Sequence, residues 1–190
     1  MPLKNRFIIL LILSMTGSMA AQDIAVPLEV QYPLLLKILT FDRNLKSRAG
    51  NDIIIGIVFQ SNFKVASQLK DRLERIIRES PIKTVEDAPI KHVAIDLDNS
   101  DLSKLIKQEN IDILYITPLR AYGIEQITTV SQLQKVMTFT GIPEYVKAGI
   151  GVGVGIKGKK PQIIINLPAA KNEGCDFNSQ LLKLANVIMK

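Results

Sequence analysis

Residues 26–51 predict a long helix followed by a loop. Apolar side chains recur every three or four positions through residues 26–45, which is the spacing of one helix face. They form two rows that together make a broad apolar arc: Leu28, Tyr32, Leu35 and Leu39, and Leu34, Ile38, Phe41 and Leu45. A broad arc predicts burial on more than one side. Residues 42–51 are charged, contain Gly50 and predict a loop.

Through the middle of the chain, β-branched runs alternate with amphipathic stretches. We predict strands over residues 52–60, 91–97, 111–117 and 136–140. Helices are expected between them, over residues 61–80, over 100–108 and around Ile124, Ile127, Val130 and Leu133. This alternation is typical of right-handed βαβ units on a parallel sheet whose two faces are covered by helices.

The end of the chain departs from this rhythm. Residues 151–156 and 162–167 both resemble strands, and the five residues between them are too few for a crossover, so they predict an antiparallel hairpin. A last helix is expected from Asp176 or Asn178 onward, burying Phe177, Leu181, Leu184, Ala185 and Ile188. The predicted fold class is α/β: a three-layer sandwich with a sheet of about six strands, mostly parallel, and a C-terminal antiparallel β-hairpin.

Residues 1–20 differ from the rest of the chain and predict a secretory signal peptide. Lys4 and Arg6 precede a short apolar run over residues 7–15, and Ser18-Met19-Ala20 fits a cleavage site between small residues. The apolar run is shorter than the roughly 20 residues that span a bilayer, although an uncleaved anchor is the alternative. We therefore expect residues 21–190 to form a single domain that is exported to the periplasm.

Charge and cysteine content narrow the possible functions. Removing Lys4 and Arg6 with the signal peptide leaves 22 basic and 18 acidic residues, a net charge of +4. Without a dense basic run, that charge is typical of a solvated surface rather than of a nucleic-acid interface. Cys175 is the only cysteine and His92 the only histidine, so the sequence provides neither an intrachain disulfide, nor a catalytic triad built on histidine, nor a histidine-rich metal site.

A glycine-rich segment superficially resembles a nucleotide-binding loop. Gly153, Gly155 and Gly158 have the spacing of a dinucleotide motif, but Pro161 and a strand follow them where the motif requires a helix N-terminus. The alternation of Gly151, Gly153 and Gly155 with Val152, Val154 and Ile156 instead predicts a strand with one bare face, against which a packed element, or less often a ligand, comes close.

Other polar residues admit two interpretations each. Asp96, Asp98 and Asp101 follow a predicted strand, where carboxylates can line a ligand cleft or cap the next helix, and we favour capping. Glu173 and Asp176 have the same ambiguity. Cys175 precedes the last helix, which could lower its pKa, but no base is evident nearby and a small packing role is favoured. The sequence predicts no catalytic residue, cofactor site or metal site.

Three segments resemble the YfiR-like family of periplasmic regulatory proteins. They are Leu28–Leu45 (LEVQYPLLLKILTFDRNL), which is similar to the first helix of that family, Ile163–Gly174 (IIINLPAAKNEG) and Phe177–Ile188 (FNSQLLKLANVI), which are similar to its late strand and last helix. The last two are the most specific.

The resemblance implies a secreted α/β protein that forms a homodimer and is not an enzyme. Characterised members repress a membrane-bound diguanylate cyclase from the periplasmic side, sometimes under the control of an outer-membrane lipoprotein, and so affect cyclic-di-GMP and biofilm formation. Better-studied members carry cysteine pairs and many have a Trp-Pro after the first helix. Here Cys175 is the only cysteine, so disulfide-based redox sensing does not carry over. Phe41–Leu45 stands in place of the Trp-Pro, and a different membrane receptor, such as a sensor kinase, is an alternative partner.

The leading hypothesis is therefore a periplasmic regulator that binds a membrane-bound cyclase or sensor kinase. We expect the row of Leu34, Ile38 and Phe41 to contribute to a dimer or receptor contact, because one sheet face cannot cover so broad an apolar arc. A small-ligand-binding protein is the second hypothesis and an enzyme the third.

Overall fold

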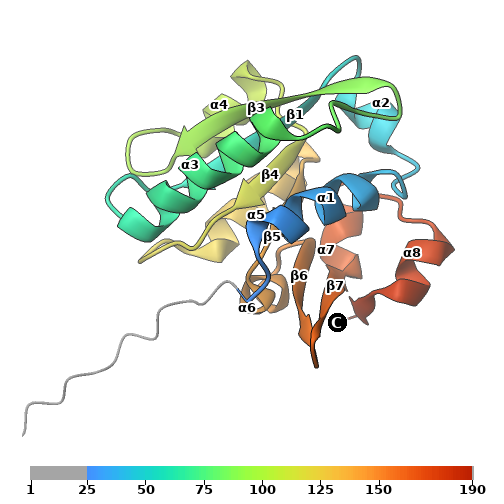
Figure 1. Cartoon of the computed structure of the whole chain (residues 1–190). Helices are drawn as coiled ribbons and strands as arrows, with labels where there is room; N and C mark the ends of the chain where they lie inside the picture. Colours follow the sequence, from blue (N-terminus) through green and yellow to red (C-terminus); the bar gives the residue numbers. More distant parts are fainter. Residues whose placement is uncertain (1–24, 190) are drawn as a thin grey trace, which may run out of the picture.

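Within residues 25–189, eight helices surround a single mixed sheet (Figure 1). The computed structural model describes residues 25–189, so the predicted signal peptide and its cleavage site lie outside the described residues. The strands within this range are β1 (Ile53–Phe59), β2 (Thr84–Val85), β3 (Ala88–Asp96), β4 (Ile113–Ile116), β5 (Met137–Thr140), β6 (Val152–Lys157), β7 (Lys160–Asn166) and β8 (Asn186–Ile188). The helices are α1 (Leu28–Leu39), α2 (Leu45–Ala49), α3 (Lys64–Glu79), α4 (Leu102–Gln108), α5 (Ile124–Gln134), α6 (Pro143–Lys147), α7 (Leu167–Asn172) and α8 (Ser179–Leu184).

The sheet has the order β2-β3-β1-β4-β5-β6-β7-β8. Strands β3, β1, β4, β5 and β6 are parallel, as the βαβ pattern predicts. The predicted hairpin is confirmed, since β6 and β7 pair antiparallel from Val152 opposite Ile165 to Lys157 opposite Lys160. The α/β class is thus confirmed, with eight strands where about six were expected, because the short strands β2 and β8 leave little pattern in the sequence.

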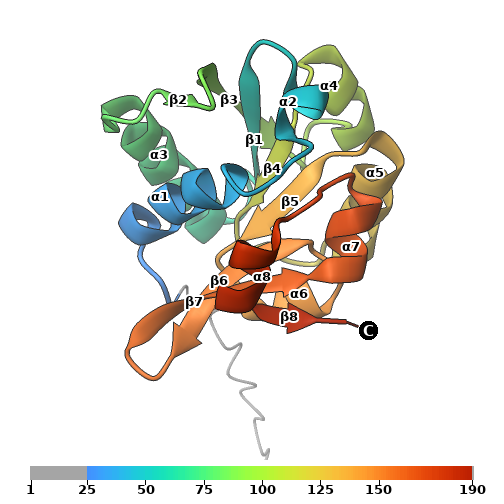
Figure 2. The ribbon, with the colours of Figure 1, turned by 90° about the vertical axis from the view of Figure 1, so that its right-hand side faces the viewer.

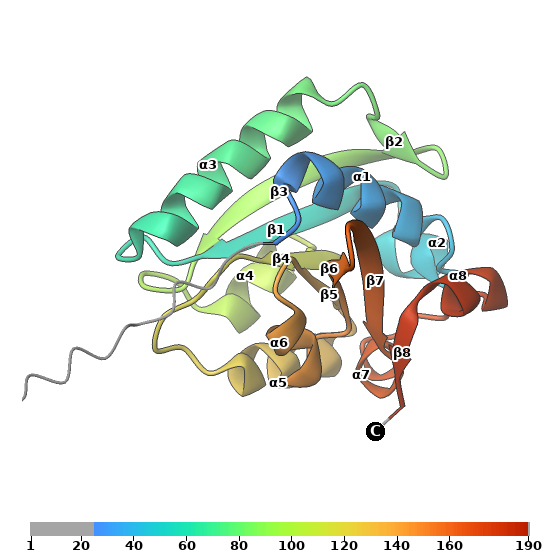
Figure 3. The same ribbon diagram turned by 60° about the horizontal axis from the view of Figure 1, so that its bottom comes forward.

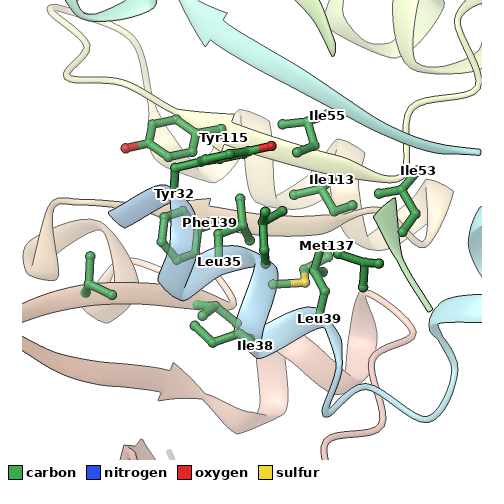
Figure 4. Close-up of a cluster of buried hydrophobic side chains, with 14 of the residues drawn as sticks. Tyr32, Leu35, Ile38, Leu39, Ile53, Ile55, Ile113, Tyr115, Met137 and Phe139 are labelled. Atoms are coloured by element: carbon green, nitrogen blue, oxygen red, sulfur yellow. The ribbon is translucent and has the colours of Figure 1, made fainter. Parts of the chain in front are cut away.

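Helices cover both faces of the sheet and enclose two hydrophobic clusters (Figures 2 and 3). Helices α1 and α3 pack on each other and over one face, where Leu35, Leu39 and Leu73 are fully buried. Figure 4 shows α1 side chains meeting those of β1, β4 and β5 in this layer. On the other face, α4 and α5 pack on each other, and Ile127 of α5 lies in one cluster with Ile95 of β3 and Leu114 of β4. Within residues 25–189, every helix is too short or too polar to cross a bilayer.

The predicted first helix is divided in two. Helix α1 ends at Leu39, and the chain then turns so that Asp42 forms an isolated β-bridge with Phe177. Two backbone hydrogen bonds form this bridge, from the Arg43 N–H to the Asp176 carbonyl and from the Asn178 N–H to the Phe41 carbonyl. A contact with a distant segment therefore overrides the local helical periodicity, and the expected loop contains α2.

The predicted last helix is too long. Helix α8 ends at Leu184, and the chain then extends as β8 beside β7, with Val187 opposite Ile165. Leu181 and Phe177 are buried as expected, but Leu184 is 71% exposed and Ile188 lies in a strand. Pairing with an open sheet edge replaces the helical continuation that the apolar spacing predicts. The short helix α6, which begins at Pro143, is a further element that the sequence pattern did not reveal.

Candidate functional site

The residues predicted to contact a partner lie on α1 but do not share one environment. Ile38 is fully buried within its own chain, and Figure 4 shows it among the core side chains. Leu34 and Phe41 are only half-buried, at the margin of the same cluster. The partner contact therefore remains a prediction for Leu34 and Phe41, whereas the position of Ile38 assigns it a packing role.

Leu34 and Phe41 belong to a row along the outer side of α1. Val30 and Lys37 complete the row at helical spacing, and both are exposed. The Lys37 ammonium lies 5.1 Å from the centre of the Phe41 ring, a cation–π contact at the surface. We call Val30, Leu34, Lys37 and Phe41 the outer row.

Two adjoining hollows continue from the end of the outer row. One, of about 200 Å³, is lined by Phe41, Arg43 and Asn178 among others, and the second, of about 250 Å³, is lined by Ala49, Ile53 and Val85 among others. Leu45, Lys46 and Glu86 line both. The Lys46 ammonium and the Glu86 carboxylate are 4.0 Å apart and thus separate the two hollows.

The turn that presents Glu86 is conformationally unusual. Glu86 and Asp87, between β2 and β3, have φ angles of 50° and 68°, in a region that non-glycine residues seldom occupy. Two positive φ angles are what a tight hairpin turn requires, although Asn and Gly fill it at lower cost. Lys46 on α2 opposes this turn, so the hollows have an apolar floor and a rim of both charges. Such a surface can bind a peptide segment or a polar small molecule.

A buried carboxyl group lies near the amino ends of β5 and β6. Glu173 is fully buried, and its Oε2 accepts a hydrogen bond from the Thr138 backbone N–H at 2.9 Å. The hydroxyls of Thr138 and Ser131 donate to its Oε1 at 2.6 and 3.2 Å. Burial raises the pKa of Glu173 to about 8, against the lowering effect of these hydrogen bonds. The group joins α5, β5 and the end of α7. Neither interpretation offered for Glu173 from the sequence, a ligand cleft or a helix cap, describes this buried role.

Gly151 makes room for this carboxyl group. A Cβ atom at Gly151 would lie 2.3 Å from Glu173 Oε2, and one at Gly153 would lie 2.5 Å from Val146 Cγ2 of α6. The bare face of β6 is therefore covered by packed protein groups. The sequence left either a packed element or a ligand against this face, and the structure shows a packed element.

A buried ion pair lies at the same end of the sheet. Arg48 of α2 donates to Asp42 at 2.6 Å, and their side chains are 10% and 0% exposed. Burial raises the pKa of Asp112, which accepts from the Ile54 backbone N–H, to about 6. Cys175 is also buried here, and burial raises the pKa of its thiol. The packing role favoured for Cys175 is consistent with this, and lowering of its pKa by the nearby helix does not occur.

The three aspartates after β3 stabilise their own loops. Asp101 accepts from the Lys104 backbone N–H and caps α4, as favoured. Asp96 accepts from the backbone N–H groups of Ser61 and Asp98. Asp98 accepts from the Asn62 backbone N–H and from the Gln60 amide. These bonds tie the loop after β3 to the loop after β1.

The remaining candidates are dispersed. Asp176 lies in the exposed loop before α8 and pairs with Arg43 at 2.7 Å, while His92 lies on β3. Among residues 25–189, no three His, Cys, Asp or Glu side chains are grouped so that they could hold a metal ion.

Comparison with known families gives one decisive match. The model of the YfiR/HmsC-like family matches residues 31–186, which is most of the chain. The protein belongs to the YfiR/HmsC-like family. The resemblance noted in the sequence is thereby confirmed. Membership makes this chain one of a family of periplasmic regulators rather than catalysts. A comparison with curated proteins gives no match.

Solved structures add information on the fold of this YfiR/HmsC-like protein. It is similar to an ABC domain in complex with L-Trp from Streptococcus pneumonia, with a TM-score of 0.58 and 13% identity over 86% of this chain and 60% of that one. It is also similar to a conserved domain protein from Vibrio cholerae, with a TM-score of 0.54 and 15% identity over 85% of this chain and 60% of that one. The ligand-free, open form of a substrate binding protein with adhesive properties from Clostridium difficile has a TM-score of 0.52 and 15% identity over 77% of this chain and 58% of that one. The chain thus spans about 60% of the length of these proteins, and at such identities the likeness concerns the fold alone.

Proposed function

We propose that this protein binds and controls an inner-membrane signalling protein, either a diguanylate cyclase or a sensor kinase, from the periplasmic side. Membership of the YfiR/HmsC-like family supports this proposal more than any other observation. The consequence would be a change in cyclic-di-GMP and biofilm formation. The protein would act as a homodimer, and an outer-membrane lipoprotein would be a further partner.

The outer row and the two hollows are the surface we propose for the membrane partner. Leu34 and Phe41 expose apolar area beside hollows that have charged rims. Apolar groups that are surrounded by polar ones are typical of surfaces at which proteins bind each other.

A pull-down from detergent-solubilised membranes of the source cell tests the proposal. The protein should retain one membrane cyclase or kinase, and the variants Leu34→Glu and Phe41→Ser should lose at least tenfold of that retention. Leu133→Glu is the matched control, because Leu133 is 77% exposed on α5, over the opposite face of the sheet. Circular dichroism and thermal unfolding should show each variant folded. Equal retention by all variants would contradict the proposed surface, and recovery of no membrane protein would contradict the proposed function.

The likeness to substrate-binding folds supports a second candidate function, the binding of a small ligand. A ligand that binds only the folded state raises the unfolding temperature, and the rise grows with the logarithm of the ratio of its concentration to its dissociation constant. A thermal-shift screen of amino acids and other small metabolites tests this candidate, and an unchanged melting temperature across the screen would contradict it.

A further inference from the structure

Strand β3 has an outer edge that is mostly unpaired. It is nine residues long, whereas β2, its neighbour on the outer side, pairs only with Ala88 and Pro89. Figure 3 shows β2 beside only one end of β3. One further bond, from the Ile90 N–H to the Lys83 carbonyl at 2.9 Å, extends that pairing. From residue 91 to residue 96 the outer edge has no neighbouring strand among the residues that the structure describes.

The direction of the backbone groups shows which residues are available. The Leu97 N–H points inward, because it donates to the Phe59 carbonyl after β1. Backbone groups alternate along a strand, so those of Lys91, Val93 and Ile95 also face β1, and those of His92, Ala94 and Asp96 face outward. Within residues 25–189, no group bonds to the outward N–H or C=O of His92 or Ala94.

Between Lys91 and Asp96, this edge lacks the features that usually prevent a strand from joining another. Proteins block open edges with proline, bulges, charged residues or a covering helix. Here Pro89 and Lys91 lie toward the β2 end, and residues 90–96 pair with β1 in unbroken register without a bulge. Ala94 is exposed, and His92 and Val93 are half-buried. The free donors and acceptors therefore fit an extended chain.

Steric and charge arguments select the register in which a second copy fits. Lys83 already occupies the position outside Ile90, so an antiparallel strand centred on Val93 would bring the partner's Asp96 into that place. Centring the pair on Ala94 avoids the collision. It also places His92 opposite the partner's Asp96. By the twofold symmetry Asp96 lies opposite the partner's His92, so this histidine–carboxylate pair occurs twice in the dimer.

We infer that the protein forms its homodimer by antiparallel pairing of β3 with β3 of a second copy, across a twofold axis at Ala94. The inference rests on the homodimer in the proposed function and specifies its surface. Two sheets then join into one, and the outward groups of His92 and Ala94 are bonded. The outer row of α1 remains free for the membrane partner.

A cysteine at the proposed axis tests the register directly. Two residues that face each other in an antiparallel hydrogen-bonded pair have Cα atoms about 5.5 Å apart, which suits a disulfide. Purified full chain carrying Ala94→Cys should therefore form a disulfide-linked dimer under mild oxidation, seen on a non-reducing gel. His92→Cys is the matched control and should stay unlinked, because its counterpart would lie roughly 13 Å away along the strand. Cys175 is buried and should not contribute.

A charge at the axis tests the strength of the contact. Ala94→Lys places two like charges opposite each other and should weaken dimerisation at least tenfold by analytical ultracentrifugation, whereas Leu133→Lys should not change it. A chain that is monomeric at all concentrations would overturn both this inference and the proposed homodimer. A dimer that Ala94→Cys fails to link, or that Ala94→Lys leaves intact, would overturn only the β3 surface.

Discussion

The amino and carboxyl ends of the parallel strands use their carboxyl groups in opposite ways. At the amino end, Asp42 and Glu173 are buried, and besides backbone N–H groups they accept from an arginine and from two hydroxyl groups. At the carboxyl end, Asp96 at the end of β3 and Asp98 in the following loop are partly accessible and accept mainly backbone N–H groups. Open α/β sheets usually bind ligands at the carboxyl end. In this protein the acidic groups at the carboxyl end hold two loops together, and the buried ion pair of Asp42 and Arg48 lies at the amino end.

The largest effect should follow the loss of the buried ion pair. Asp42→Ala leaves the Arg48 guanidinium buried without its carboxylate, so the free energy of unfolding should fall by about 3–5 kcal/mol. Urea-induced unfolding followed by circular dichroism measures this. Arg43→Ala is the control, because its pair with Asp176 is exposed and should contribute little. If the free energy of unfolding fell equally in both variants, the buried pair would contribute no more to stability than the exposed pair.

The next effect should depend on pH. The pKa of Glu173 is about 8 in the folded chain, against an ordinary value of 4.5, so the folded state binds this proton more tightly than the unfolded state. The stability that this group contributes is therefore complete below about pH 4.5 and is lost as the pH rises to about 8. The raised pKa of Asp112 has the same effect at lower pH, so its contribution to stability is lost as the pH rises from 3.8 to about 6.

Glu173→Gln separates the two groups. The variant cannot ionise, so its unfolding free energy should decline less than that of the wild type between pH 6 and pH 9, as measured by urea unfolding at each pH. Parallel curves for the two proteins would mean that Glu173 does not hold its proton in the folded state.

The smallest effect should come from the carboxyl end. Asp101→Ala removes the cap of α4 and should lower the free energy of unfolding by about 1 kcal/mol, with no dependence on added ligand. Asp101→Asn, which keeps a capping oxygen, should restore most of the loss. A loss near that of Asp42→Ala would mean that this end is as tightly coupled to the core as the other.

Elements with strong local signals could be predicted from sequence. The strands β1, β3, β4 and β5 and the hairpin of β6 and β7 follow from β-branched runs and from the short turn at residues 158–159. The short elements β2, β8 and α6 could not, since two to five residues carry too little periodicity. The end of α1 at Leu39 depends on the bridge between Asp42 and Phe177, which no local pattern contains.

The site was predictable only in part. The breadth of the apolar arc drew attention to α1, but periodicity does not distinguish Ile38 in the core from Leu34 and Phe41 at its margin. The hollows depend on α2 meeting the turn at Glu86, and the Glu173 site depends on three elements meeting around one carboxyl group. The available signal was the glycine pattern of residues 151–155, which includes Gly151 opposite that carboxyl group. The pattern indicated that some group packs closely there but did not identify Glu173.

The bridge between Asp42 and Phe177 also has a consequence for folding. It joins residues more than 130 positions apart, and contacts between such distant segments form late because a long loop must close first. Phe41 is next to this bridge and lines one of the hollows. An incompletely folded chain would therefore not present the surface proposed for the membrane partner, and only the fully folded protein would be competent to bind.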